Sequence, residues 1–264
     1  MLRAMANNGR VVWYELLTSD VNGAIAFYTE VIGWKTQAWE TGNYTMWAGA
    51  QGPLGGVTQL PDQAKQMGAP PYWQANVQVA NLDTAIAKVK ELGGKILVEE
   101  DVPTIGRFSV IADPQGAVIA LYTPTAEMAP HDTSKPGEFQ WHELYTTDHA
   151  AAFEFYRQVC GWEKIQEHDM GPMGVYVVWG NAGTPLGGMM TMPPGMTGPT
   201  GQPLPPGWMY YVTVADLDAT LERAKSKGAR VLNGPMPVPG GARIVQLLDP
   251  QGAAFALITP PPAG

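Results

Sequence analysis

Hydrophobic and polar residues alternate along the first part of the chain with two successive periods. The segment from Val11 to Thr18, VVWYELLT, is rich in β-branched and aromatic residues, which favours a strand. Apolar residues then recur at helical spacing between Asp20, which suits a helix N-cap, and Gly33, which suits a helix end. The pattern therefore predicts a strand followed by an amphipathic helix. The apolar positions of this helix are Ala24, Phe27, Tyr28 and Val31.

The rest of the first half predicts further short strands and a second helix. This helix is expected over 82–92, because Gly93 and Gly94 follow it directly. Three more strands come after it, and an Asp-Pro-Gln-Gly turn joins the last two. The order in each half is then strand, helix and three strands, twice over. The strands between the two helices are expected near 36–40, 44–48, 55–60 and 72–79, with a Pro-rich loop before the last of them.

The second half of the chain repeats the first. The segment WYELLTSDVNGAIAFYTEVIGW begins at Trp13, and WHELYTTDHAAAFEFYRQVCGW begins at Trp141. Tyr44 to Pro61 matches Tyr176 to Pro193, and both halves carry the DPQG turn. Such a long period indicates duplication of a whole domain. The sequence predicts an α+β chain of two tandem domains, over 1–124 and 138–264, joined by a linker over 125–137.

These motifs resemble the glyoxalase/bleomycin-resistance superfamily, also called vicinal oxygen chelate proteins. The matching pieces are D-x-x-x-A-x-x-FY-x-x-x-x-GW, LGG, and DPQG before an apolar strand, in both halves. The W-x-E-L start of the first strand is similar to a two-domain branch typified by a mycobacterial secreted antigen. The resemblance implies two glyoxalase-like domains, in each of which two βαβββ modules form a cup of curved mixed sheet. Such a cup commonly holds a divalent metal.

The positions that hold metal ligands in the superfamily carry other residues here. Only Gln74 could bind a cation, and the strands after the two LGG motifs contain neither His nor an acidic residue. The sequence therefore predicts no metal site and no cofactor, while a divalent metal held by other residues stays open. The positions implied by the resemblance are Trp13, Gln74 and Ala120 in the first half, and Trp141, Met209 and Ala256 in the second.

Glu15 and Glu143 are the candidate catalytic residues. Alternate residues of a strand share a face, so Glu15 is expected beside Trp13, and Glu143 beside its own tryptophan. Each carboxylate could act as a general base or hold a cationic ligand. The alternative is a structural ion pair, for which Arg107 and Arg243 are the expected partners. The candidate ligand-binding residues are Trp13, Trp39, Gln74, Trp141, Met209 and Tyr211.

Composition and charge narrow the range of partners. The net charge of -8 disfavours nucleic acid and anionic membranes. The single cysteine, Cys160, suggests a small buried residue, and the four histidines have no metal-binding spacing. With neither a signal segment nor a long apolar run, a cytoplasmic protein is expected. The tryptophans that recur in both halves are expected in the core. These recurring tryptophans are Trp34, Trp47, Trp162 and Trp179.

Three functions remain open at this point. The first is binding of a small organic molecule in an aromatic-lined cup without a metal. The second is an enzyme, either a glyoxalase-like metal-dependent lyase or isomerase, or a metal-free enzyme of secondary metabolism with a cup glutamate as base. The third is a scaffold whose cups are inactive. A homodimer is compatible with each of them, and the expected partner of the first two is a small organic molecule.

Overall fold

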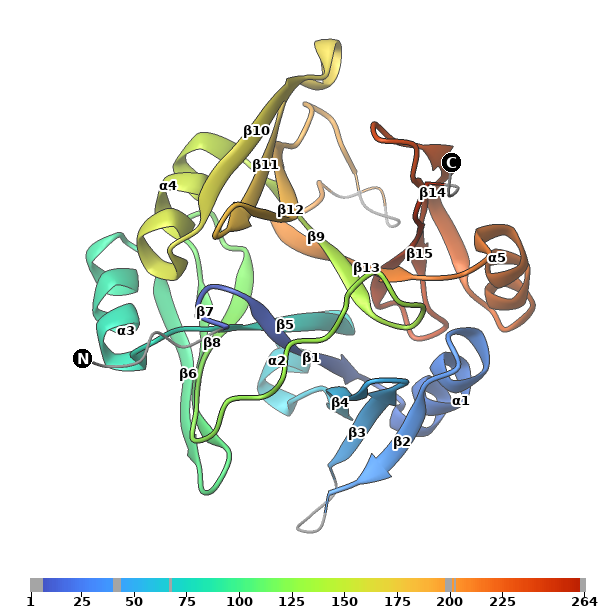
Figure 1. Ribbon diagram of the computed structural model, residues 1–264, viewed down its shortest axis with the longest axis horizontal. Coiled ribbons are helices and arrows are strands. Elements are labelled where there is room, and N and C mark those ends of the chain that lie inside the picture. The colour runs from blue at the N-terminus through green and yellow to red at the C-terminus, as the bar shows by residue number, and fades with distance from the viewer. Residues whose placement is uncertain (1–6, 40–43, 67, 198–200, 202, 262–264) are drawn as a thin grey trace. The chain divides into compact units, whose positions relative to one another are not determined.

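The computed structural model describes residues 7–39, 44–66, 68–197, 201 and 203–261, and its chain forms four βαβββ modules (Figure 1). The first module contains β1 (Val11–Thr18), α1 (Val21–Val31), β2 (Lys35–Ala38), β3 (Thr45–Gly49) and β4 (Gly52–Gln59). The second contains β5 (Tyr72–Gln78), α3 (Leu82–Glu91), β6 (Lys95–Val102), β7 (Gly106–Ala112) and β8 (Val118–Pro124). The short helix α2 (Asp62–Gln66) lies between them.

The second half of the chain repeats this order. The third module contains β9 (Phe139–Thr146), α4 (His149–Cys160), β10 (Glu163–Asp169), the 3-10 turn η1 (Gly171–Met173), β11 (Val175–Asn181) and β12 (Thr184–Thr191). The fourth contains β13 (Gly207–Thr213), α5 (Leu217–Ser226), β14 (Arg230–Pro237), β15 (Arg243–Leu248) and β16 (Ala254–Thr259). The predicted α+β fold with four modules is confirmed.

Some details differ from the prediction. The expected strand near 36–40 ends at Ala38, and its last predicted residue, Glu40, lies outside the described residues. The expected Pro-rich loop contains α2, in which Lys65 forms an ion pair with Asp62 at 3.2 Å. Asp62 occupies the first turn and Lys65 the last, so both charges complement the helix dipole.

Helix starts follow the residue types that the sequence analysis identified. The Asp20 side chain accepts a hydrogen bond from the Gly23 N–H at 2.9 Å, and Asp148 caps α4 in the same way. These aspartates satisfy amide groups that would otherwise lack partners in the first helical turn. The N-cap role predicted for Asp20 is therefore confirmed.

The strands form two mixed eight-stranded sheets with the same order. The first runs β2-β3-β4-β1-β5-β8-β7-β6, and the second β10-β11-β12-β9-β13-β16-β15-β14. In the first sheet β1 pairs with β4 in parallel, and Glu15 lies opposite Gly56. In the second sheet β9 pairs with β12 in parallel, and Glu143 lies opposite Gly188. The first strand of each half is thus central in its sheet and carries its glutamate there.

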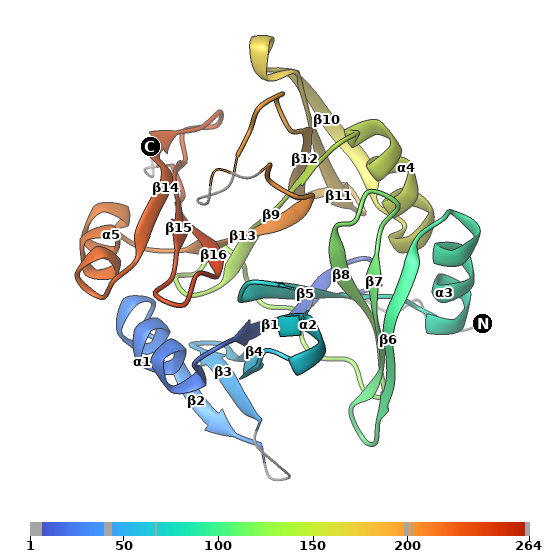
Figure 2. The same cartoon turned by 180° about the vertical axis from the view of Figure 1, so that it is seen from behind.

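The described chain divides into two compact units, and each unit takes segments from both halves of the sequence. One unit comprises the described residues within Met1–Val12, Ala75–Pro130 and His142–Trp208. The other comprises the described residues within Trp13–Gln74, His131–Trp141 and Met209–Gly264. Within the first, α3 lies beside α4, and within the second, α1 lies beside α5, in both views of the molecule (Figures 1 and 2). We call the first of these units the 75–208 unit and the second the 13–264 unit.

Buried hydrogen bonds join the two halves of the sequence inside each unit. In the 13–264 unit, the Tyr28 hydroxyl donates to the Asp249 carboxylate at 3.1 Å, and Trp34 Nε1 donates to the Gly137 carbonyl at 2.7 Å. The 75–208 unit has the equivalent bonds. There the Tyr156 hydroxyl donates to Asp113 at 3.1 Å, and Trp162 Nε1 donates to the Gly9 carbonyl at 2.7 Å.

Aromatic side chains fill the core of each unit, as predicted for the recurring tryptophans. In the 13–264 unit, Trp34 stacks on Tyr28 with ring centroids 5.6 Å apart, and Trp73 donates to the Tyr28 hydroxyl at 2.9 Å. In the 75–208 unit, Trp162 stacks on Trp179 at 3.7 Å. Since Trp34, Trp47, Trp162 and Trp179 are each at most 1% exposed, their predicted core position is confirmed.

The described helices are all short. None of them combines the length and the apolar content that crossing a bilayer requires.

Candidate functional site

Glu15 lies on β1 within a small group of aromatic hydrogen-bond donors in the 13–264 unit. Its Oε2 atom accepts a hydrogen bond from Trp13 Nε1 at 3.0 Å and another from the Tyr44 hydroxyl at 2.8 Å. Trp13 Nε1 is also 3.0 Å from the Tyr44 hydroxyl oxygen. All three side chains remain partly exposed. As alternation along β1 predicted, Trp13 and Glu15 share one face of the strand.

The second oxygen of this carboxylate, Oε1, is buried and has no hydrogen-bond partner. Burial raises the pKa of Glu15 to about 7, and the hydrogen bonds from Tyr44 and Trp13 lower it only in part. The carboxyl group therefore changes its charge near neutral pH. An unpaired buried acceptor costs free energy, so a donor that reached Oε1 would gain more than an ordinary hydrogen bond.

Tyr44 belongs to this group, although the sequence analysis did not select it. It lies next to Thr45, at the start of β3, and Met46 of that strand is the register partner of Gly56. A Cβ atom on Gly56 would overlap the Tyr44 hydroxyl and lie 2.7 Å from Glu15 Oε1. The second glycine of the LGG motif therefore leaves room for the tyrosine ring. The signal in the sequence was the match of Tyr44 with Tyr176.

The second copy of the site differs in the partner of its carboxylate. Glu143 is 7% exposed, and its Oε2 accepts a hydrogen bond from the Tyr145 hydroxyl at 2.7 Å. In the first copy the position of Tyr145 is occupied by Leu17, which has no donor. A Cβ atom on Gly188 would overlap the Tyr176 hydroxyl, as in the first copy.

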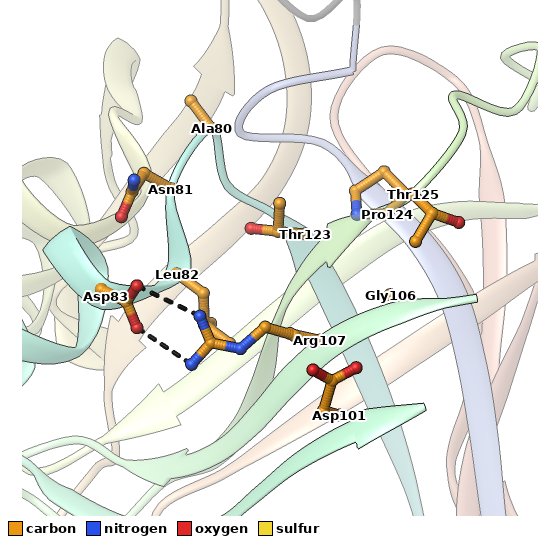
Figure 3. Close-up of a pocket in the computed structure, with 10 residues that line it drawn as sticks. All are labelled: Ala80, Asn81, Leu82, Asp83, Asp101, Gly106, Arg107, Thr123, Pro124 and Thr125. Carbon is orange, nitrogen blue, oxygen red and sulfur yellow. Dashed lines mark hydrogen bonds and ion pairs between the residues drawn. The ribbon is translucent and has the colours of Figure 1, made fainter. Parts of the chain in front are cut away.

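The arginines expected to pair with these glutamates lie elsewhere. Arg107 on β7 forms an ion pair with Asp83 at 2.9 Å, and both residues line a surface pocket together with Asp101 (Figure 3). Arg107 also forms an ion pair with Glu99 at 3.0 Å. Arg243 on β15 pairs with Asp218 at 2.8 Å. The predicted pairing of these arginines with Glu15 and Glu143 is therefore wrong. Each arginine instead meets the acidic residue in the first turn of the helix of its own module.

The residues at the positions implied for metal ligands do not fit a divalent cation. Trp13 presents an N–H donor to Glu15, and alanine occupies positions 120 and 256. Ala256 is in register with Tyr211 on β13 and with Gln246 on β15, and Gln246 Nε2 donates to the Tyr211 hydroxyl at 2.7 Å. Nowhere in the described parts of the chain do three His, Cys, Asp or Glu side chains gather as a cation site.

The other candidate ligand-binding residues differ widely in exposure. Gln74, Met209 and Tyr211 are buried, with exposed fractions of 6%, 8% and 1%. Trp141 is partly exposed, whereas Trp39 is 37% exposed, and its backbone N–H donates to the Tyr44 carbonyl at 2.9 Å. Trp39 is thus anchored beside Tyr44 through its backbone. The binding role of these residues stays a prediction.

His142 and Cys160, which belong to chemically reactive residue types, are both packed in the interior. His142 is buried, its Nδ1 donates to the Leu186 carbonyl at 2.6 Å, and burial lowers its pKa to about 4. Cys160 is buried in α4, and burial raises the pKa of its thiol. A neutral thiol is a weak nucleophile, in agreement with the packing role expected for this residue.

Curated relatives cover nearly the whole chain. The protein CFP32 of Mycobacterium tuberculosis is 29% identical over 98% of both chains. The anthracycline biosynthesis protein DauV of Streptomyces sp. (strain C5) is 31% identical and covers 95% of this chain and 93% of its own.

Solved structures share the fold at low sequence identity. Homoprotocatechuate 2,3-dioxygenase of Brevibacterium fuscum superimposes with a TM-score of 0.68 at 15% identity, over 95% of this chain and 80% of that chain. The Mn(II)-bound glyoxalase of Novosphingobium aromaticivorans gives 0.63 at 15% identity, over 94% and 81%.

The family model described as Glyoxalase/Bleomycin resistance protein/Dioxygenase superfamily matches the chain twice, over residues 10–121 and 138–257. With both sequence repeats matched and the βαβββ modules present in each, the chain belongs to this superfamily.

Proposed function

We propose that the protein binds a small organic molecule on the aromatic face around Glu15, without a metal ion. The observation that carries this proposal is the unpaired Oε1 atom of Glu15 beside Trp13 and Tyr44. A structural carboxylate would have a cation or enough donors to satisfy both oxygens. Arg107 and Arg243 could have supplied this cation, but they form ion pairs with Asp83 and Asp218 instead.

Further support comes from the residues around the carboxylate. Trp13 and Tyr44 offer apolar ring surface together with fixed polar atoms, a combination typical of small-molecule sites. The relative DauV is named as an anthracycline biosynthesis protein, which agrees with a small organic partner. The positions implied for metal ligands include Trp13, Ala120 and Ala256, which do not bind cations. This favours direct binding of the organic molecule by side chains.

Binding is tested by titrating the protein with a panel of neutral aromatic compounds and following tryptophan fluorescence. Saturable binding of at least one compound is expected, and Glu15→Gln should weaken it about tenfold or more, since a hydrogen bond to a charged group contributes about 1.5–3 kcal/mol. Glu100→Gln, at an exposed position of β6, is the control. The absence of saturable binding across the panel would contradict the proposal.

A metal-free enzyme with Glu15 as general base is the second candidate. It is favoured by one observation, the pKa of about 7, because a base is most effective when its pKa lies near the working pH. The protein should then speed hydrogen–deuterium exchange at the carbon next to a carbonyl in aromatic ketones, as followed by NMR. The rate should rise with pH through about 7 and be lost in Glu15→Gln. Equal rates with and without protein would contradict this activity.

A further inference from the structure

The two copies of the site differ at one position on the strand that carries the glutamate. In the second copy Tyr145 follows Glu143 by two residues on β9, and its hydroxyl donates to the carboxylate at 2.7 Å. In the first copy Leu17 occupies this position on β1. Glu15 therefore accepts a phenolic hydrogen bond from Tyr44, but it has no second phenolic donor at the position that Tyr145 occupies in the second copy.

The glutamates of the two copies also differ in exposure. Glu143 is buried with 7% of its surface exposed, whereas Glu15 is only partly buried. The donors that Glu15 does have, Trp13 Nε1 and the Tyr44 hydroxyl, both bind the same oxygen. Its other oxygen, Oε1, has no donor at all. Both copies thus show that a phenol hydroxyl fits against this type of carboxylate, and in the second copy Tyr145 supplies one from the same strand.

We propose that the first copy alone is the ligand-binding copy, and that its ligand is an aromatic hydroxyl compound whose O–H donates to Glu15 Oε1. The ligand hydroxyl would supply the donor that Tyr145 supplies to Glu143. This inference rests on the proposed binding function and names the ligand class for the same site. It also assigns the second copy a structural role, with its carboxylate held by Tyr145.

The charges of the site and of the chain disfavour an anionic ligand. A carboxylate or phosphate ligand would place negative charge against the Glu15 carboxylate, in a chain whose net charge is -8. A ligand that only accepts hydrogen bonds would leave ionised Oε1 unpaired, and binding would then keep the cost of that buried acceptor. A hydroxyl on an aromatic ring satisfies the oxygen and offers a flat surface to Trp13 and Tyr44.

The inference is tested with two probes that differ only in the donor, 2-naphthol and its methyl ether 2-methoxynaphthalene. Binding is measured by calorimetry at about pH 8, where Glu15 is mostly ionised. The wild-type protein should bind 2-naphthol at least tenfold more tightly than the ether. In Glu15→Gln the two donors from Trp13 and Tyr44 should hold the amide oxygen at the Oε2 position. The amide nitrogen then takes the position of Oε1, where it cannot accept from a hydroxyl.

Matched variants of the two copies separate the outcomes. Glu15→Gln should abolish the preference for 2-naphthol, while Glu143→Gln should retain it. Leu17→Tyr, which installs the residue of the second copy, should lower 2-naphthol affinity at least tenfold. Equal affinity of the wild-type protein for both probes, or equal loss in the Glu15 and Glu143 variants, would overturn this inference and leave the binding function standing. Binding of neither probe by the wild-type protein would contradict both.

Discussion

The Glu15 carboxyl group loses more hydration on folding than its two hydrogen-bond donors replace. Both donors, Trp13 and Tyr44, bind Oε2, so the other oxygen is buried without compensation. The pKa of the group therefore rises from 4.5 to about 7. The pKa of His142, a basic group, shifts in the opposite direction, because burial lowers it to about 4. In both cases the neutral form is favoured because the folded protein removes water from the charge.

The raised pKa of Glu15 predicts a pH dependence of stability. The folded protein binds this proton more tightly than the unfolded chain, so the stabilisation is complete below about pH 4.5 and is lost as pH rises to about 7. The full loss is about 3 kcal/mol. Glu15→Gln should therefore gain stability relative to wild type across this range and keep a constant advantage above it. Urea unfolding at a series of pH values measures the difference, with Glu100→Gln as control. A Glu15→Gln curve parallel to the wild-type curve would contradict the burial of this charge.

At the level of single residues, the sequence selected Glu15 and Glu143 alike as candidates but did not predict what surrounds them. Alternation along a strand was sufficient to place Trp13 beside Glu15, because that relation is local. The partners of Arg107 could not be derived, since they depend on how β7 faces the first turn of α3. Tyr44 was missed for a similar reason: its contact with Glu15 depends on the register of β3 and β4 with β1.

Among the elements, β4 shapes the site because Gly56 has no side chain and so leaves room for Tyr44. Gly56 lies opposite Glu15 on β1 and opposite Met46 on β3. The LGG motif was visible in the sequence as a repeated signal, but its purpose became clear only from the position of the Tyr44 hydroxyl above the glycine. The helix caps, by contrast, could be predicted directly, because Asp20 and Asp148 bind amide groups within their own first turns.

Gly56→Ala is predicted to displace Tyr44 from Glu15. The added methyl group would overlap the Tyr44 hydroxyl, so the ring must move and one donor to Oε2 is lost. We expect a loss of stability of about 1–3 kcal/mol and a further rise of the Glu15 pKa. Thermal and urea unfolding measure the first effect. Gly207→Ala is the control, because a Cβ there meets only the Pro205 carbonyl oxygen at 3.9 Å. Unchanged stability in Gly56→Ala would show that the tyrosine is not held as described.

On the scale of the whole molecule, the sequence repeat and the compact units follow different divisions of the chain. The duplication suggested that each half could be considered separately. The buried bonds from Tyr28 to Asp249 and from Tyr156 to Asp113 instead connect residues of different halves within one unit. Such contacts between distant segments are invisible to local patterns. The periodicity could therefore predict all four modules but not which of them share a core.

Separate production of residues 1–124 and 138–264 tests this division. Each piece would lose half of both cores, including the hydrogen-bond partners of Trp34 and Trp162. We expect neither piece alone to unfold cooperatively, and we expect the two to associate when they are produced together. Circular dichroism melting and size-exclusion chromatography measure these properties. A cooperative melt of either piece alone would contradict the shared cores.

The most direct test of the account is the titration of Glu15 itself. Carbon-13 NMR of protein labelled at the glutamate Cδ atoms gives the pKa of each carboxyl group, and the signal missing from Glu15→Gln identifies the residue. We expect a midpoint at about pH 7 for Glu15 in the ligand-free protein. A midpoint near the ordinary 4.5 would mean that the carboxylate is already hydrated or paired, which would contradict its role as the buried, unpaired acceptor of the site.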